Sequence, residues 1–471
     1  MKSNFNLTTM KQFFSNIKGD AFGGITAGVV ALPLALAFGV SSGLGPSAGL
    51  YGAIFISFFA ALFGGTNTQI SGPTAPMTAV SMVIVSGIVA ANDGDINVAL
   101  PAILTVFLIA GLSQVGLGLL GLGKYIKYIP YPVVSGFMTA IGVIILLTQV
   151  LPSLGYNPKE DAGYVNLFKA QAKEVILQNI LKDEAGEGVL VLENLKSTID
   201  RASLITKENI LKEAKTLASK EASGTIGALK VLPRALQNIN WLELLLALGT
   251  ILIIYGFKRI TTVVPSTLVA LVVMAGIAVA FELDYIPIEE IPNGLPIPQL
   301  AIFTQFKLAT ITPYIFTGFT LALLGAIDSL LTSIVADNMT KTKHRPNKEL
   351  IGQGIGNSIA SIFGGIPGAG ATIRTVVNIN SGGKTKLSGM IAGVMLLFVL
   401  LAMGPIASKI PTAVLSGILI TVGIGVMDYK GLKAIPALPR DLSFGPLKVS
   451  SEVLIMLVVL FLSTFWDLIF A

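Results

Sequence analysis

Apolar stretches long enough to form membrane helices follow one another along most of this chain. About 20 apolar residues cross a bilayer as a helix, because its hydrocarbon core is about 30 Å thick. Apolar residues make up 53% of the sequence and charged residues only 12%, whereas roughly a quarter of a soluble domain is charged. We therefore predict an all-α polytopic membrane protein. The predicted spans are residues 21–40, 48–64, 74–91, 98–121, 131–151, 241–257, 263–281, 314–335, 350–364, 372–380, 386–404, 411–427 and 452–470.

The loop charges predict how the chain is oriented. With a cytoplasmic amino terminus, the inward loops hold the basic groups and the outward loops hold the acidic ones, as the positive-inside rule requires. This pattern predicts a multi-pass protein of the cell membrane. The formal charge of +6 then reflects topology and does not indicate nucleic acid. The basic loops are 124–127, 258–259, 341–348, 384–386 and 430–448, and the acidic ones are 93–95 and 282–290.

Residues 152–239 interrupt the apolar pattern with a long segment of mixed charge. Apolar residues recur there at helical spacing, and the loop alternation places the segment outside the cytoplasm. A helical cap, a partner-binding element and an excursion of solvated helices all fit. Because charge alternation along a helix usually marks an exposed face, it favours solvated helices.

Asp328 lies in the middle of the apolar run 315–335. An ionised carboxylate there costs roughly 2.5 to 3.5 kcal/mol on insertion scales, so such residues usually face a protein-lined cavity and bind or relay an ion. Thr332 is four residues later, on the same helical face. The pair indicates a shared cation site. The alternative is a carboxylate held by interhelical hydrogen bonds for packing alone.

Two broken segments carry the most specific local pattern. In SGPTAPMTAV, Pro73 and Pro76 flank Thr74, and in GGIPGAGATIRTVVNINSGGKT a stretch of small residues leads into Thr372. Such backbone must be buried in protein or line a cavity, because lipid cannot satisfy its hydrogen bonds. Each stretch then starts a half-helix, whose free N–H groups suit an anion, while unwound carbonyls suit a cation. Such a pair is typical of inverted-repeat transporters. Close packing of helices at glycines would explain the glycines alone.

Five motifs together resemble the SulP inorganic anion permeases, most of all the cyanobacterial-type sodium-dependent bicarbonate transporters. They are GGITAGVVALPLALAFGV, SGPTAPMTAV, AIDSLLTSIVAD, NKELIGQGIGN and GAGATIRTVVNINSGGKT. The resemblance implies a seven-plus-seven inverted-repeat fold like that of the uracil permeases, with a core domain and a gate domain. It divides the chain into 1–151 and 240–281 (first repeat), 152–239 (insertion), 282–313 (outer loop) and 314–471 (incomplete second repeat). The last segment and a cytoplasmic STAS domain of family members would follow Ala471.

The resemblance also implies site residues. The sodium ion that is co-transported would bind Asp328, Thr332, Gly370 and Thr372, and no organic cofactor is implied. The bicarbonate would bind Thr74, Ala371 and Thr372, and Phe38 would line its pocket. Leu34 stands where sulfate-type members carry glutamine. The lipid bilayer and a homodimer of the full-length protein are the other implied partners.

Two positions depart from the bicarbonate-type pattern. Arg374 stands where the close bicarbonate transporters have glycine, and many carriers of other anions have arginine there. Gly72 stands where they have glutamate. Arg374 is therefore a candidate for the anion site, and it favours a more highly charged anion than bicarbonate.

These observations predict a secondary active transporter, a symporter of sodium and an inorganic anion, bicarbonate above all, that works by alternating access. Proton- or sodium-coupled transport of sulfate or a dicarboxylate is the alternative, and an anion channel is a second one. We do not expect an enzyme. An intramembrane aspartyl protease would need a second acid, for which Asp467 is the candidate, and His344, the one histidine, lies in a basic loop.

Overall fold

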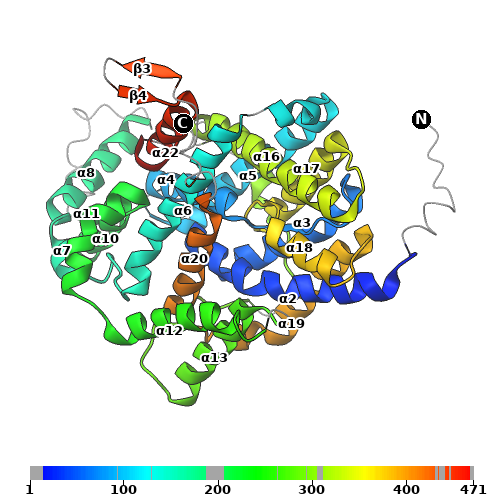
Figure 1. The fold of residues 1–471 in the computed structure, drawn as a ribbon. Helices are drawn as coiled ribbons and strands as arrows, with labels where there is room; N and C mark the ends of the chain where they lie inside the picture. The colour runs from blue at the N-terminus through cyan, green and yellow to red at the C-terminus, as the bar shows by residue number, and fades with distance from the viewer. Residues whose placement is uncertain are drawn as a thin grey trace.

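The computed structural model describes residues 14–92, 94–128, 130–186, 206–261, 264–292, 294–304, 311–429, 433, 441–444 and 447–466. Helices dominate these residues, as Figure 1 shows. The first part of the chain forms α2 (Ile17–Ser42), α3 (Pro46–Phe63), β1 (Ser71–Gly72), α4 (Ala75–Ala91), α5 (Ile96–Leu119), η1 (Leu122–Tyr128) and α6 (Tyr131–Ser153). The middle forms α7 (Ala162–Asn166), α8 (Lys169–Gly186), α10 (Lys207–Glu221), α11 (Gly224–Gln237), α12 (Trp241–Phe257), α13 (Ser266–Ala280) and α14 (Ala301–Thr304). The last part forms η2 (Thr312–Tyr314), α16 (Ile315–Thr340), α17 (Pro346–Ile362), β2 (Ala369–Gly370), α18 (Thr372–Asn380), α19 (Lys386–Ala407), α20 (Thr412–Val426), β3 (Leu442–Phe444), β4 (Leu447–Val449), α22 (Ser451–Phe461) and the π-helical turn η4 (Leu462–Trp466).

The apolar helices agree with the predicted spans. Among the described residues, α2, α3, α5, α6 and the segment Thr312–Thr340 are long and apolar enough to cross a membrane. The helices α4, α13, α20, α22 and the described part of α19 are shorter and apolar. The two segments predicted to be broken are α4 and α18, and α18 begins at Thr372 as the sequence predicts. Prediction and structure therefore agree on where the helices are interrupted.

The helices pack in two groups. In the first group α17 lies against α3 and α5, and α19 lies against α2 and α3, so helices from both ends of the chain interleave (Figure 1). Small residues allow this close approach, since an added Cβ at Gly352 would lie 2.3 Å from the backbone nitrogen of Gly64. In the second group α6, α12, α20 and α22 pack together and α13 packs on α12. We call these groups the core and the gate.

The insertion forms a helical cap of α7, α8, α10 and α11 at the left of Figure 1. Its apolar side chains, among them Tyr164, Ala214 and Val231, form a buried cluster that continues to Leu151 and Leu154 at the end of α6. Asp161 accepts hydrogen bonds from Arg234 (2.6 Å from Nε) and Tyr156 (2.7 Å). Of the three alternatives, the described part fits a helical cap, because its apolar faces pack on each other and on the gate. The charged faces of these helices are exposed.

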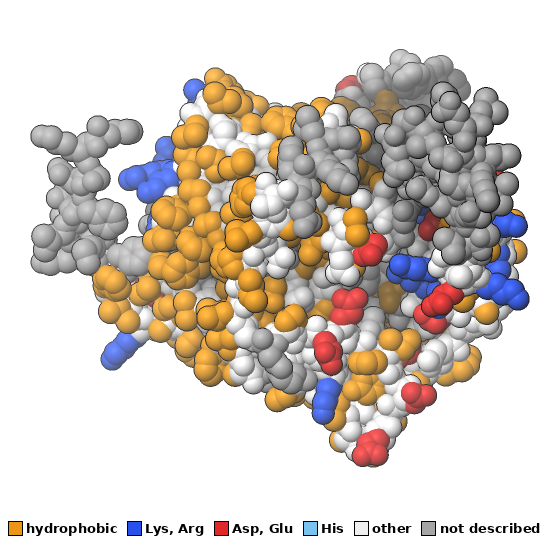
Figure 2. Space-filling view, turned by 180° about the vertical axis from the view of Figure 1, so that it is seen from behind, with side chains coloured by type: hydrophobic (Ala, Val, Ile, Leu, Met, Phe, Trp, Pro, Cys, Tyr) orange, Lys and Arg blue, Asp and Glu red, His pale blue; other side chains and the backbone are white. Residues whose placement is uncertain are grey.

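Charges are distributed unevenly over the surface. Figure 2 shows hydrophobic side chains gathered between basic side chains near the amino-terminal edge and a region rich in acidic side chains toward the opposite edge. Lys341 and Lys343 are exposed in the loop after α16, Lys348 is exposed in the first turn of α17, and Glu282 and Glu289 are exposed in the outer loop. This separation supports the predicted orientation.

Candidate functional site

The two half-helices start from a short antiparallel crossing deep in the core. Ser71 of β1 pairs with Gly370 of β2, and Gly72 pairs with Ala369. The crossing continues through the backbone bond from Ala371 N to Ile70 O (2.8 Å). Each strand is too short to stand alone, but pairing satisfies backbone groups that lipid could not. The starts of α4 and α18 are thereby fixed side by side.

Oxygen atoms of the predicted sodium site cluster at the start of α18. The Thr332 hydroxyl, from α16, donates to the carbonyl of Gly370 (2.9 Å) and lies 2.8 Å from the hydroxyl of Thr372. Asp328 lies one turn earlier on α16, and its buried Oδ2 has no hydrogen-bond partner among the described residues. One oxygen of this carboxylate is therefore left for another ligand. Carboxylate, hydroxyl and carbonyl oxygens are ligands suited to hard cations.

Thr74 and Arg374 lie at the crossing, next to the start of α4. Thr74 is the residue before α4, and its buried hydroxyl makes no hydrogen bond within the described structure. Arg374 is only 2% exposed, and its Nη2 donates to the carbonyl of Pro73. Its Nε and Nη1 find no partner among the described residues. Both Thr74 and Arg374 lie within interacting range of the Asp328 carboxylate.

The two departures from the bicarbonate-type pattern are in contact. Gly72 has a φ of +151°, and a Cβ added there would lie 2.6 Å from Nη1 of Arg374. The absence of a side chain at position 72 therefore makes the room that the guanidinium occupies. Sequence reasoning treated the two positions separately, and only the antiparallel pairing shows that they are one local exchange.

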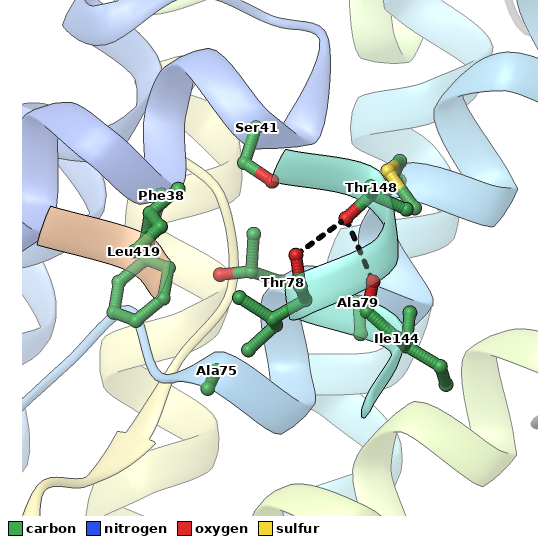
Figure 3. A pocket seen from close by; sticks show the side chains of 10 residues that line it. Phe38, Ser41, Ala75, Thr78, Ala79, Ile144, Thr148 and Leu419 are labelled. Atoms are coloured by element: carbon green, nitrogen blue, oxygen red, sulfur yellow. Dashed lines mark hydrogen bonds between the residues drawn. The ribbon is translucent and has the colours of Figure 1, made fainter. Parts of the chain in front are cut away.

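Phe38 lies apart from the oxygen cluster, beside a narrow cavity that adjoins the start of α4. Figure 3 shows Phe38 and Ser41 of α2, Ala75 and Thr78 of α4, and Thr148 of α6 around this space. Its volume is about 10 Å³, which is roughly the room of one water molecule. Leu34 is buried in the main apolar cluster of the core. The structure thus brings the predicted residues together, with Phe38 on the cap-facing side.

Glu349 supports the crossing and was not predicted as part of the site. It is 1% exposed and accepts hydrogen bonds from the backbone of Gly65 (2.7 Å) and Thr66 (2.8 Å) and from the side chains of Gln69 and Gln353 (2.9 Å each). Gln69 also accepts from Ser333 of α16 (2.8 Å). A buried carboxylate needs such a full set of donors. The sequence signal for Glu349 was its position within the motif NKELIGQGIGN.

Exposure differs between the two ends of α16, and we call the more exposed end the open side of the crossing and the buried end its closed side. On the Asp328 face of α16, Leu321 and Leu324 toward the helix start are buried (0% and 7% exposed). Toward the helix end, Leu331 and Met339 are 36% and 38% exposed, and Thr372 is exposed as well. The open side is the one that leads to the basic loop 341–348.

Of Asp467 and His344, the residues that the enzyme alternatives would need, the structure describes His344 alone. His344 bonds through its Nδ1 and its backbone nitrogen to Asp337 (2.7 and 2.9 Å) and closes the loop after α16. Asp467 lies outside the described residues.

Comparison with known proteins identifies the class. A profile described as the sulfate permease family matches residues 17–178 and 202–440. The chain therefore belongs to the sulfate permease family, a family of membrane transporters and not of enzymes. It is 42% identical over 429 residues to the bicarbonate transporter BicA of Synechocystis sp.. That match covers 90% of this chain and 64% of the relative, so the chain spans less than two thirds of the relative's length.

Solved structures confirm the fold. The transmembrane domain of a cyanobacterium bicarbonate transporter BicA superposes with a TM-score of 0.75 at 40% identity, and the match covers 97% of both chains. The murine Slc26a9 anion transporter in the inward-facing state superposes with a TM-score of 0.72 at 18% identity, over all of this chain and 70% of that one. The second likeness shows the fold alone. The chain is a multi-pass membrane protein with the predicted inverted-repeat architecture.

Proposed function

We propose that this protein is a sodium-coupled symporter of bicarbonate that works by alternating access. The observation that carries the proposal is the buried, unpartnered Oδ2 of Asp328 beside the oxygens of Thr332, Thr372 and Gly370. A carboxylate in the membrane interior is costly unless positive charge compensates it, and a bound cation would add to the partial compensation that Arg374 supplies. The relatedness to proteins named bicarbonate transporters supports the choice of anion.

Sodium is the cation that these ligands favour. One carboxylate with two hydroxyls and a carbonyl gives an all-oxygen set with a single negative charge, which suits a monovalent cation. Unwound carbonyls beside half-helices bind sodium in other transporters of broken-helix design. A proton on Asp328 would neutralise the charge too, but it would not use the hydroxyls and the carbonyl.

The anion would bind between the starts of α4 and α18. Both helix starts direct free N–H groups and the positive end of a helix dipole to this point. The free hydroxyl of Thr74 adds a donor. Sodium bound at Asp328 would remove the repulsion of the incoming anion, and each ligand would then improve the site for the other.

Arg374 favours a second candidate, a carrier of sulfate or a dicarboxylate. Its buried guanidinium offers two unpartnered N–H groups at the crossing. A guanidinium bonds well to doubly charged oxyanions. A fixed positive charge near Asp328 also supplies part of the compensation that sodium would supply.

Uptake into proteoliposomes tests the two candidates against each other. We expect an inward sodium gradient to raise labelled bicarbonate uptake at least about tenfold over a potassium gradient, and unlabelled sulfate to compete poorly. Arg374→Gly should then keep a measurable part of the bicarbonate uptake. Arg345→Gly in the basic loop is the matched control for loss of an arginine. Saturable sodium-driven sulfate uptake that disappears in Arg374→Gly would instead support the second candidate, and currents too large for a carrier would indicate a channel.

The cell membrane as location, a cytoplasmic amino terminus and a homodimer of the full-length protein are part of the same proposal. The exposed basic loop 341–348 and the acidic loop 282–290 support the orientation.

A further inference from the structure

A second, larger cavity lies between the cap and the gate. Its volume is about 320 Å³, far more than the single water that fits the narrow cavity beside Phe38. It is bounded by the end of α6, the junction of α10 and α11, the start of α12 and the outer loop near Ile286. The lining residues are Thr148, Leu151, Pro152, Gly155, Tyr156, Asn157, Pro158, Ser219, Ala222, Ser223, Glu243, Ile286 and Thr412.

The large cavity lies on the closed side of the crossing. The helix α4 starts at the crossing and leads toward the cap, since a Cβ at Gly94 would lie 2.3 Å from the hydroxyl of Thr216 in α10. At Gly87 of α4 an added Cβ would lie 2.8 Å from the hydroxyl of Tyr314, next to the start of α16. The cap therefore lies toward the end of α4 that is near the start of α16, where the Asp328 face of α16 is buried.

Thr148 joins the two cavities. It lines both the narrow cavity beside Phe38 and the large cavity under the cap, and its hydroxyl donates to the carbonyls of Ile144 and Ile145 in its own helix (2.9 and 3.2 Å) (Figure 3). Across the narrow cavity, Thr78 is 3% exposed and its hydroxyl has no partner among the described residues. Thr78 lies one helical turn after Thr74 on α4.

We propose that the cavity under the cap is the outer vestibule of the transport path, and that the constriction between Thr78 and Thr148 closes the end of this vestibule that faces the crossing. The inference rests on the proposed transport function. The order of features is continuous: the crossing with Thr74, the one-water space at Thr78, the shared residue Thr148, and then the vestibule. Four of the residues that line the vestibule carry hydroxyls, namely Tyr156, Ser219, Ser223 and Thr412. The hydroxyls of Tyr156, Ser223 and Thr412 donate to Asp161, Lys220 and Pro287, so the lining is polar and held in place. The cap is thus part of the path and not a peripheral addition.

Single cysteines test the vestibule cleanly, because the chain has no cysteine of its own. Ser219→Cys lines the vestibule, and its neighbour Lys220→Cys on the same helix is exposed and does not. We expect a sulfonate-bearing methanethiosulfonate, which adds bulk and negative charge, to lower uptake at least about fivefold in Ser219→Cys. Lys220→Cys, modified to the same extent by mass spectrometry, should keep its uptake. Equal uptake of the two modified proteins would overturn the proposal.

A second measurement does not depend on which ion is carried. Thr148→Cys lies at the inner end of the vestibule and should react with an impermeant thiol reagent added on the side where Lys220→Cys reacts. Adding Ser219→Trp should fill the vestibule and slow this reaction at least about fivefold, whereas Lys220→Trp should not. An unchanged rate with Ser219→Trp would refute the vestibule. If wild-type protein takes up no bicarbonate, the proposed function fails, while the labelling rates still decide the path.

Discussion

The half-helices α4 and α18 start side by side from paired strands, yet they bring different chemistry to the crossing. The start of α4 offers the hydroxyl of Thr74, and its sequence carries no charged residue. The start of α18 offers Thr372 and Arg374, and it lies against α16 with Asp328 and Thr332. Both repeats therefore contribute a strand and a half-helix start to the site, while its charged side chains, Asp328 and Arg374, come from the second repeat alone. On the proposed function, the second repeat holds the cation and the anion lies between both.

The largest expected effect follows from removing the charge of the second repeat. Asp328→Asn keeps the size of the side chain but loses the carboxylate that sodium would neutralise, so we expect sodium-dependent uptake to fall at least about tenfold, which corresponds to 1.4 kcal/mol. Proteoliposome uptake under sodium and potassium gradients measures it. Asp337→Asn, on the same helix but bonded to His344 in the loop, is the matched control. Full uptake by Asp328→Asn with unchanged sodium dependence would show that the Asp328 carboxylate does not bind the coupled cation.

The second prediction compares the two helix starts directly. Thr372→Val removes a hydroxyl that lies 2.8 Å from Thr332, so it should weaken both sodium and anion binding. Thr74→Val should weaken anion binding only. A hydrogen bond of about 1 kcal/mol corresponds to roughly fivefold in each affinity.

Thermal stabilisation by sodium without anion separates the two variants from each other. Thr372→Val should need roughly fivefold more sodium for the same stabilisation, and Thr74→Val should behave as wild type. The Michaelis constant for the anion should rise in both. Equal sodium responses in both variants would show that the cation site is not confined to the second repeat.

The sequence predicted the half-helices well because proline, glycine and threonine act locally. The bounds of α18 match the predicted span 372–380. Asp328, Thr332, Thr372 and Gly370 lie together as expected. The contact of Gly72 with Arg374 could not be predicted, because it depends on which strand residues pair. The hydrogen-bond set of Glu349 and the position of Thr148 between two cavities depend likewise on segments far apart in the chain.

The cap was the weakest part of the prediction for a related reason. Charge alternation favoured an exposed face on its helices and left open what the apolar faces pack against. The sequence does not show that Leu151 and Leu154 extend the apolar cluster of the cap. Nor does charge alternation distinguish an exposed pair from one that ties two segments together. Asp161 and Arg234 are 73 residues apart and tie the start of α7 to α11 within the cap.

The smallest expected effect concerns the contact between Asp161 and Arg234. Hydrogen bonds from Arg234 above all, and also from Tyr156 and the backbone of Tyr164, hold the pKa of Asp161 well below its usual range. A carboxyl group whose folded pKa is depressed stabilises the fold above its unfolded pKa of about 3.9, and this contribution is lost as the pH falls through the folded value. The cap should therefore be unchanged between about pH 5 and pH 8 and loosen only below about pH 4. Asp161→Asn should imitate that loss at neutral pH.

Limited trypsin digestion from the cap side, with uptake measured in parallel, checks this prediction. We expect faster cleavage within the cap of Asp161→Asn and uptake within about twofold of wild type, because the apolar cluster still holds the cap in place. Glu221→Gln is the matched control, since the Glu221–Lys230 pair is about half exposed on both sides and such pairs contribute little. It should be cleaved like wild type. If Asp161→Asn resisted trypsin as wild type does, the contact of Asp161 with Arg234 would not stabilise the cap. If Asp161→Asn lost uptake altogether, the apolar cluster alone would not keep the cap in place.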